Sequence, residues 1–170
     1  LLDTTEMKPG QLKRFGISAL ESGDIFTAVD YLSVYHSKRP EDSKVAYQLA
    51  ELYFKERNYP KAAEMYHAAF REDRFKLPDA QFKYAKCLKM QGKYEKALNE
   101  FRVFERYIRY LQGKEFRKYK DLLETERYGC LMAIEDTTNA NVVVKVLPGN
   151  VNHAHIDFCP IALTEQQLIY

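Results

Sequence analysis

Tryptophan is absent from this sequence, and glycine and proline are scarce, with 7 and 6 residues in a chain of 170. An all-β fold needs many turns, so this shortage argues against one and favours helices. No run of about 18 apolar residues occurs, and a membrane-spanning helix is therefore not expected. The formal net charge is only +2, which gives no indication of nucleic-acid binding. Hydrophobic residues still make up 46% of the chain, enough for a continuous core.

Motifs that mark enzymes are also missing. The sequence has no glycine-rich phosphate loop, no H-E-x-x-H and no G-x-S-x-G. His153 and His155 with Asp157 could hold a metal, because side chains two apart on a strand share a face. Two histidines in a short extended piece are more often solvated, however. We therefore predict a protein that is not an enzyme, with no catalytic residue, no cofactor and no metal.

Neither the cysteines nor the first residues decide the cellular compartment. Cys87, Cys130 and Cys159 are an odd number without C-x-x-C spacing, so idle or buried thiols are favoured over a disulfide. The chain starts at Leu1 with neither an initiator methionine nor a signal-peptide pattern. We interpret it as a fragment whose targeting information lies elsewhere.

The strongest signal in the sequence is its self-similarity. Segments that begin near residues 16, 50 and 85 align at spacings of 34 and 35 residues, with small, turn-forming and large positions in the same order. The aligned columns are Gly16/Ala50/Ala85, Gly23/Arg57/Gly92, Ile25/Tyr59/Tyr94, Ala28/Ala62/Ala97, Leu32/Tyr66/Phe101 and Tyr35/Ala69/Phe104.

Each column has a physical role. Gly16 and its equivalents lie where two helices approach most closely, so a larger side chain would push them apart. Gly23 and Gly92 can adopt the left-handed conformation that ends a helix. Arg57 occupies that column in the middle segment; Asn58 beside it is the residue type next best suited, after glycine, to such a turn, and it is a candidate helix cap.

This order of residues resembles the tetratricopeptide repeat over about residues 10–106, as three repeats. Pro40 matches the closing proline of that family, whereas Arg74 departs from it and the early tryptophan is absent. The resemblance implies an all-α superhelix. The predicted helices span residues 10–22, 25–37, 43–56, 60–73, 78–91 and 94–112, followed by a longer capping helix from residue 113 to 134. Its apolar positions are Phe116, Tyr119, Leu122, Leu123, Tyr128, Leu131 and Met132, with Gly129 as a small contact.

The composition changes after residue 136. We predict that residues 1–136 form the repeat domain with its capping helix, and that 137–170 form a linker and a short extended tail. Strands are expected at 142–147, 154–158 and 167–170, either as a tail on the helices or as the start of a truncated β-propeller.

The end of the tail carries a second resemblance. Phe158-Cys159-Pro160 followed by Gln167–Tyr170 is similar to the first strands of a WD40-like blade. Tetratricopeptide repeats that run into such a blade resemble the PorE-like OmpA-family components of the type IX (Por) secretion system. That resemblance implies a periplasmic protein, associated with the outer membrane, that contacts peptidoglycan only through a domain absent here.

A repeat of this kind binds through the first helix of each pair, which lines the concave face of the superhelix. Aromatic side chains flanked by lysines suit a protein or peptide segment with apolar anchors and some acidic character. The alternative is that Tyr47, Phe54 and Phe82 pack against the C-terminal tail of the chain. The predicted protein-binding residues are Lys13, Ile17, Leu20, Lys44, Tyr47, Gln48, Glu51, Phe54, Phe82, Lys83, Lys86 and Lys89.

One subclass of the family holds the C-terminal carboxylate of a partner with two lysines, two asparagines and an arginine. The corresponding positions are Lys13, Ile17, Gln48, Asp79 and Lys83. Only Lys13 matches, so this role is not expected.

Two functions follow from these observations. The first is a non-enzymatic scaffold in a periplasmic secretion or envelope complex, with other subunits as partners. The second is a general peptide-binding adaptor, in the cytoplasm or the periplasm, that presents client proteins to another machine. Neither requires nucleic acid or insertion of this fragment into a membrane.

Overall fold

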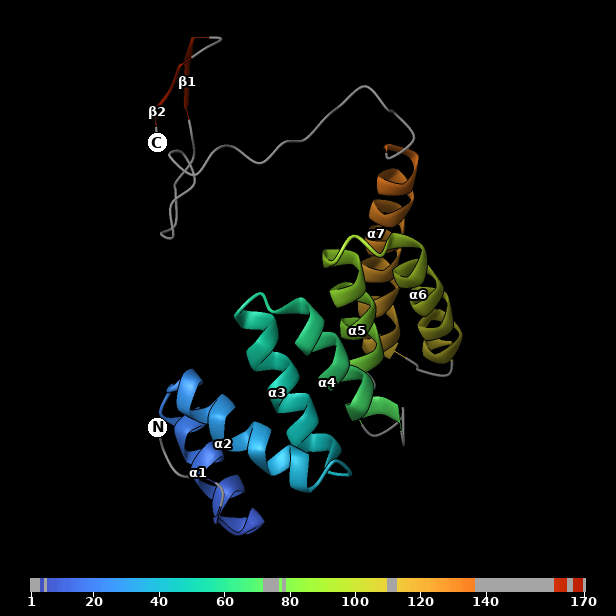
Figure 1. Cartoon of the computed structure of the whole chain (residues 1–170). Coiled ribbons are helices and arrows are strands. Elements are labelled where there is room, and N and C mark those ends of the chain that lie inside the picture. The colour runs from blue at the N-terminus through green and yellow to red at the C-terminus, as the bar shows by residue number, and fades with distance from the viewer. Residues whose placement is uncertain are drawn as a thin grey trace. The chain divides into compact units, whose positions relative to one another are not determined.

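The computed structural model describes residues 4, 6–71, 77, 79–109, 113–136, 161–164 and 167–169. The chain divides into two compact units, Leu1–Thr137 and Thr138–Tyr170. The described part of the first unit is entirely helical (Figure 1). Its elements are α1 (Pro9–Glu21), α2 (Ile25–Lys38), α3 (Ser43–Lys55), α4 (Tyr59–Arg71), α5 (Ala80–Met90), α6 (Tyr94–Ile108) and α7 (Gly113–Asp136).

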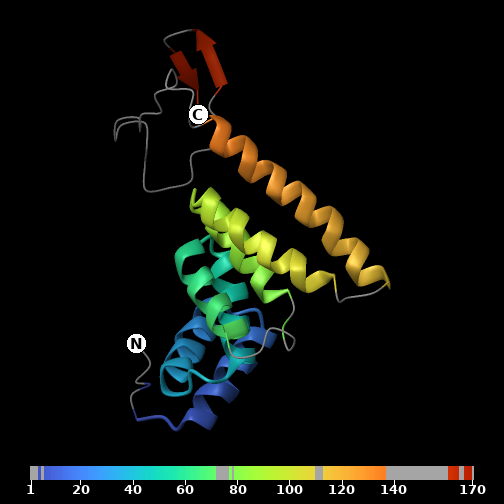
Figure 2. The same ribbon diagram turned by 90° about the vertical axis from the view of Figure 1, so that its right-hand side faces the viewer.

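The helices pack as hairpins in chain order. Helices α1 and α2, α3 and α4, and α5 and α6 form three pairs, and α4 also packs on α5. Helix α7 lies beside α6 at the C-terminal end of the array (Figure 2). The predicted all-α helical-repeat superhelix is thus confirmed. Helix α6 ends at Ile108 rather than at residue 112, and positions 110–112 lie outside the described residues. None of the described helices combines the length and the apolar character needed to cross a bilayer.

The turn inside each hairpin depends on a left-handed residue. Gly23 has φ +81° and Gly92 has φ +72°, as predicted, and Arg57 itself adopts φ 58° in the middle pair. Asn58 caps the following helix, as predicted: its Oδ1 accepts a hydrogen bond from the Lys61 amide at 3.4 Å. Because the turn residue of each pair is left-handed, the amide of the residue after it can donate a hydrogen bond to a carbonyl near the end of the first helix. These bonds are Asp24 N to Ala19 O, Asn58 N to Tyr53 O and Lys93 N to Leu88 O, at 2.9, 2.8 and 3.0 Å.

Small residues allow the helices of each pair to approach closely. A Cβ atom at Gly16 would lie 2.6 Å from Cγ and Cδ2 of Leu32 and 3.3 Å from its backbone nitrogen. Ala50 and Ala85, in the same column, are fully buried. The predicted role of this column is therefore confirmed.

The core consists of two clusters of different composition. The larger cluster joins α1–α4 and one side of α5, and it contains mainly aliphatic residues, alanine and tyrosine. The second cluster joins α5, α6 and α7 around Phe82, Phe101, Phe104 and Tyr119. The centroid of the Tyr119 ring lies 5.2 Å from that of Phe104 and 5.9 Å from that of Phe82.

The apolar residues of α7 lie on two different faces. Tyr119, Leu123 and Cys130 are buried, at spacings of four and seven residues that place them on one side of the helix. Other apolar side chains of the predicted pattern are exposed. The exposed fractions are 41% for Leu122, 64% for Tyr128, 42% for Leu131 and 49% for Met132. The predicted capping helix is thus present, and part of its apolar surface stays exposed.

The described part of the second unit is a β-hairpin. Strand β1 (Ile161–Thr164) pairs antiparallel with β2 (Gln167–Ile169), with Ile161 opposite Ile169 and Ala162 opposite Leu168. Strand β2 confirms the extended segment predicted near residue 167, whereas β1 was not predicted. The strands expected at 142–147 and 154–158 lie outside the described residues.

Candidate protein-interaction site

The predicted binding residues all lie on the first helices of the three pairs. Lys13, Ile17 and Leu20 are on α1, Lys44 to Phe54 are on α3, and Phe82 to Lys89 are on α5. Most of these side chains are partly or fully exposed, but Phe82 is 5% exposed. The surface they form is called the first-helix face below.

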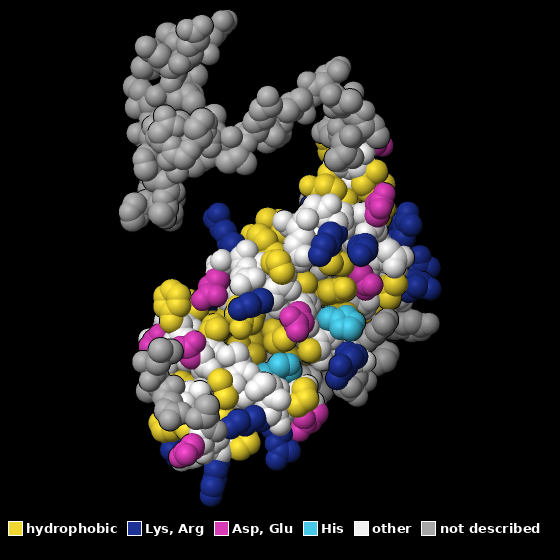
Figure 3. All heavy atoms as spheres, in the orientation of Figure 1, with side chains coloured by type: hydrophobic (Ala, Val, Ile, Leu, Met, Phe, Trp, Pro, Cys, Tyr) yellow, Lys and Arg dark blue, Asp and Glu magenta, His cyan; other side chains and the backbone are white. Residues whose placement is uncertain are grey.

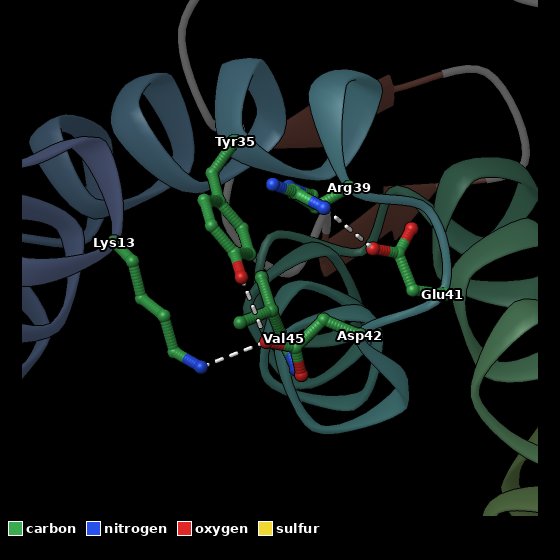
Figure 4. Close-up of polar contacts among 6 residues, drawn as sticks. All are labelled: Lys13, Tyr35, Arg39, Glu41, Asp42 and Val45. Atoms are coloured by element: carbon green, nitrogen blue, oxygen red, sulfur yellow. Dashed lines mark hydrogen bonds and ion pairs between the residues drawn. The ribbon is translucent and has the colours of Figure 1, made fainter. Parts of the chain in front are cut away.

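A polar cluster joins the first pair to the second (Figure 4). Asp42 ends the loop before α3, and its Oδ1 accepts a hydrogen bond from the Val45 amide at 3.3 Å, which caps the helix. Its Oδ2 accepts bonds from Lys13 Nζ at 2.7 Å and from the Tyr35 hydroxyl at 2.9 Å. Burial opposes ionisation of Asp42, but these bonds outweigh it and lower the pKa of the carboxyl group. Lys13 is therefore engaged within the protein.

A second polar cluster joins the second pair to the third. Lys83 Nζ donates to Glu51 Oε1 at 2.7 Å and lies 3.1 Å from Asp79 Oδ2. The Tyr47 hydroxyl donates to Asp79 at 2.5 Å and accepts from Lys83 at 2.5 Å. The Tyr66 hydroxyl donates to Glu51. Burial lowers the pKa of Lys83, but its hydrogen bonds with Glu51, Tyr47 and Asp79 more than compensate and raise it. Sequence reasoning placed Tyr47, Glu51 and Lys83 on one surface but did not predict this network.

A third cluster attaches α7 to α5. Glu126 lies 3.1 Å from Lys86 Nζ and 2.8 Å from Lys89 Nζ. Burial favours the protonated form of Glu126, but the two lysines hold its pKa below the ordinary value. A Cβ atom at Gly129 would lie 2.6 Å from Lys89 Nζ, so the predicted small contact is present. Helix α7 thus covers part of the surface that the sequence assigned to a partner.

Phe82 does not have its predicted role, because residues of α6 and α7 cover it. The sequence suggested an aromatic anchor for a partner. In the structure, however, the centroid of the Phe82 ring lies 5.5 Å from that of Phe101 and 5.5 Å from that of Phe104. It belongs to the core and contributes only its edge to the surface. The signal that could have indicated this burial is the apolar column Tyr119, Leu123 and Cys130 on α7.

One groove of about 300 Å³ brings five of the predicted residues together. Its apolar walls include Phe54 from α3, Phe82 from α5, and Tyr119 and Leu122 from α7. Charged side chains line its rim. The predicted residues in the groove are Glu51, Phe54, Phe82, Lys83 and Lys86, and the additional ones are Tyr66, Asp79, Lys118, Tyr119 and Leu122. We call this the α3–α5–α7 groove.

Lys13 and Lys44 border a separate, more polar depression at the start of α3. Charges of both signs are interspersed around an apolar area on the face that Figure 3 shows. That face therefore has no continuous basic surface of the kind that binds nucleic acid.

The cysteines that the structure describes are core residues. Cys87 and Cys130 are both free and buried. Burial raises the pKa of the Cys87 thiol to about 12 and also raises that of Cys130, which suppresses thiolate chemistry. Within the described ranges, no group of three or more His, Cys, Asp or Glu residues could hold a metal. His153, His155, Asp157 and Cys159 lie outside them.

Comparison with known proteins supports the repeat. Residues 79–110, which include α5 and α6, match the family model of the tetratricopeptide repeat. The type III secretion translocator chaperone SycD of Yersinia enterocolitica has a similar structure, with 18% identity, 78% of this chain and 92% of that chain covered, and a TM-score of 0.60. This helical array has the tetratricopeptide-repeat fold.

Eukaryotic tetratricopeptide domains are similar too. The TPR2B domain of yeast Sti1, solved as a pHsp70 complex, is 18% identical, with 75% of this chain and 98% of that chain covered and a TM-score of 0.56. The TPR domain of Sgt2 from Aspergillus fumigatus is 18% identical, with 82% of this chain and 88% of that chain covered and a TM-score of 0.55. No curated protein sequence matches the chain.

The geometry of the tetratricopeptide array also bears on the carboxylate-holding positions. Lys13 pairs with Asp42, and Lys83 pairs with Glu51 and Asp79. Both ammonium groups are thus neutralised by carboxylates of the same chain. A partner carboxylate at either lysine would have to compete with these internal ion pairs.

Proposed function

We propose that this tetratricopeptide array is a non-enzymatic protein-interaction scaffold that holds a segment of a partner protein in the α3–α5–α7 groove. The observation that carries the proposal is the combination of an open apolar groove with a charged rim on the first-helix face. Grooves of this kind take apolar anchors of a partner, with polar contacts around them.

Similar proteins support a peptide or protein as the occupant. SycD was solved in complex with a peptide of the translocator YopD, at 18% identity and a TM-score of 0.58. The TPR2B domain of Sti1 was solved as a pHsp70 complex. From these proteins we infer only that the ligand of this chain is a peptide or protein segment; we do not infer which protein it belongs to.

A secretion complex is the cellular context that we propose for this scaffold. What supports it is the resemblance of the repeats and of the segment after residue 158 to PorE-like OmpA-family components of the type IX secretion system. This would place the protein in the periplasm, in association with the outer membrane. Sequencing the whole gene tests it: a lipoprotein signal upstream and an OmpA-like domain downstream support the context, and a cytoplasmic gene product with neither favours the adaptor function.

Photo-crosslinking tests the groove itself. A photoreactive amino acid at Leu122, in the groove, should capture a defined protein when the chain is expressed in its source cells. The matched control is the same substitution at Tyr128, which is 64% exposed on the same helix but does not line the groove. Capture at position 128 and not at 122 would contradict the proposal. Lys83 is unsuited to this test because its replacement would disturb the network with Glu51 and Asp79.

A further inference from the structure

The lysines around the α3–α5–α7 groove differ in how far the protein itself neutralises them. Lys83 pairs with two carboxylates, Glu51 and Asp79. Because the hydroxyls of Tyr66 and Tyr47 also donate to these carboxylates, their oxygens are already engaged. The α3 side of the groove therefore has little unsatisfied charge to offer a partner.

The α7 side of the groove is different. Lys86, which lines the groove, shares the carboxylate of Glu126 with Lys89 just outside it, so two ammonium groups face one acid and leave an excess of positive charge. Lys118 is exposed, and its ammonium lies 5.6 Å from the centroid of the Tyr119 ring. Among the side chains that the structure describes, no carboxylate pairs with Lys118. The rim of the groove on this side is therefore electropositive.

The apolar surface lies directly beside this positive rim. Leu122 is one helical turn from Lys118 and is 41% exposed, and both line the groove together with Phe54. An apolar side chain that enters the groove therefore places its neighbours within reach of Lys118. A carboxylate there gains a charge partner without displacing an ion pair of the protein.

We propose that the groove selects protein segments in which a large apolar side chain lies next to an acidic one, with the acid directed to Lys118. The inference rests on the proposed function, because it names the chemistry of the partner of the same groove. It assigns Lys118 and Leu122, neither of which the sequence had placed on the binding surface. Lys118 sets the charge preference, and Leu122 contributes to the apolar wall.

Selection from a phage-displayed library of random peptides tests this inference with the purified chain. The wild-type protein should enrich peptides with Asp or Glu beside Leu, Phe or another large apolar residue. Lys118→Glu should lose that acidic preference or reverse it toward Lys and Arg. Lys120→Glu makes the same change of charge on α7 outside the groove, and it should select the same peptides as the wild type.

Binding measurements with one enriched peptide give the size of the effect. Lys118→Glu should weaken binding about tenfold, and Lys120→Glu should change it by less than about twofold, because only the former reverses a charge at the site. Circular dichroism should show all three proteins equally helical.

Two results would overturn the inference. One is a wild-type selection without acidic preference, or one that Lys118→Glu leaves unchanged; binding at the groove would then stand, but not its charge preference. The other is no enrichment by any of the proteins, which removes the selectivity altogether. The proposed function is judged separately, by crosslinking at Leu122.

Discussion

The two junctions between helix pairs use the same kind of contact in different surroundings. At each junction, the aspartate directly before a first helix accepts a hydrogen bond from a side chain on the first helix of the preceding pair. Asp42 accepts from Lys13 at 2.7 Å, and Asp79 accepts from the Tyr47 hydroxyl at 2.5 Å. Lys13 and Tyr47 occupy equivalent positions, 34 residues apart. The junctions thus repeat along with the helices.

The difference between the junctions lies in what surrounds the aspartate. Asp42 also caps α3, whereas Asp79 makes no capping bond to α5. Asp79 instead belongs to the network around Lys83, which extends to the α3–α5–α7 groove. The first junction therefore serves to order a helix and the second to form the edge of the α3–α5–α7 groove.

The largest effect is expected at the second junction. Lys83→Met leaves Glu51 and Asp79 without their cation, and because the Lys83 side chain is only 30% exposed, the free energy of unfolding should fall by about 2–3 kcal/mol. Urea denaturation measures this change. Lys44→Met, an exposed position on α3, is the control and should alter stability by less than about 0.5 kcal/mol. Equal effects of the two substitutions would show that the network does not stabilise the array.

At the first junction, Asp42→Ala should lower the free energy of unfolding by about 1–2 kcal/mol, because α3 loses its cap and Lys13 loses its partner. Asp42→Ser can still cap the helix and should recover part of the loss in the same urea experiment. Asp79→Ser should recover nothing relative to Asp79→Ala, since Asp79 is not a cap. If serine restored stability at both positions, Asp79 would also act as a helix cap, and the two junctions would not differ in this respect.

Acid should reduce the contribution of Asp42. Its pKa in the folded protein lies below the ordinary value of 3.8, so ionised Asp42 stabilises the fold above that pH, and the stabilisation is lost as the pH falls through the folded pKa. The stability difference between wild type and Asp42→Asn should therefore be constant near neutral pH and shrink below about pH 4. A difference that grows in acid would contradict the lowered pKa.

The smallest effect is expected for Lys13. Its side chain is 42% exposed, so solvent screens the pair with Asp42, and Lys13→Met should lower stability by about 0.5 kcal/mol or less. Added salt should reduce the difference further. A loss as large as that of Lys83→Met would show that the two junctions are energetically alike.

The sequence predicted the hairpins well because their determinants are local. Gly23 and Gly92 end helices through their own backbone conformation, and Gly16 is small because Leu32, on the adjoining helix, requires the space. Even Arg57, an unfavourable residue for φ 58°, lies in the column where the repeat requires that turn.

The groove could not be predicted in the same way, because it depends on contacts between residues far apart in the chain. Nothing near Phe82 indicates that Tyr119 will cover it, and nothing near Lys86 indicates that Glu126 will pair with it. Leu122 was predicted only as one of the apolar positions of the capping helix, because the spacing alone does not show which of these side chains stay exposed. Lys118 was missed because its position depends on how α7 packs on the array.

The most direct test of the groove is a nuclear magnetic resonance titration of the isotope-labelled chain with a peptide selected on the wild-type protein. The backbone amide signals that shift most should belong to Phe54, Lys86, Lys118 and Leu122, from the three helices that line the groove. Shifts confined to Tyr128, Leu131 and Met132, with the groove signals unchanged, would contradict this expectation.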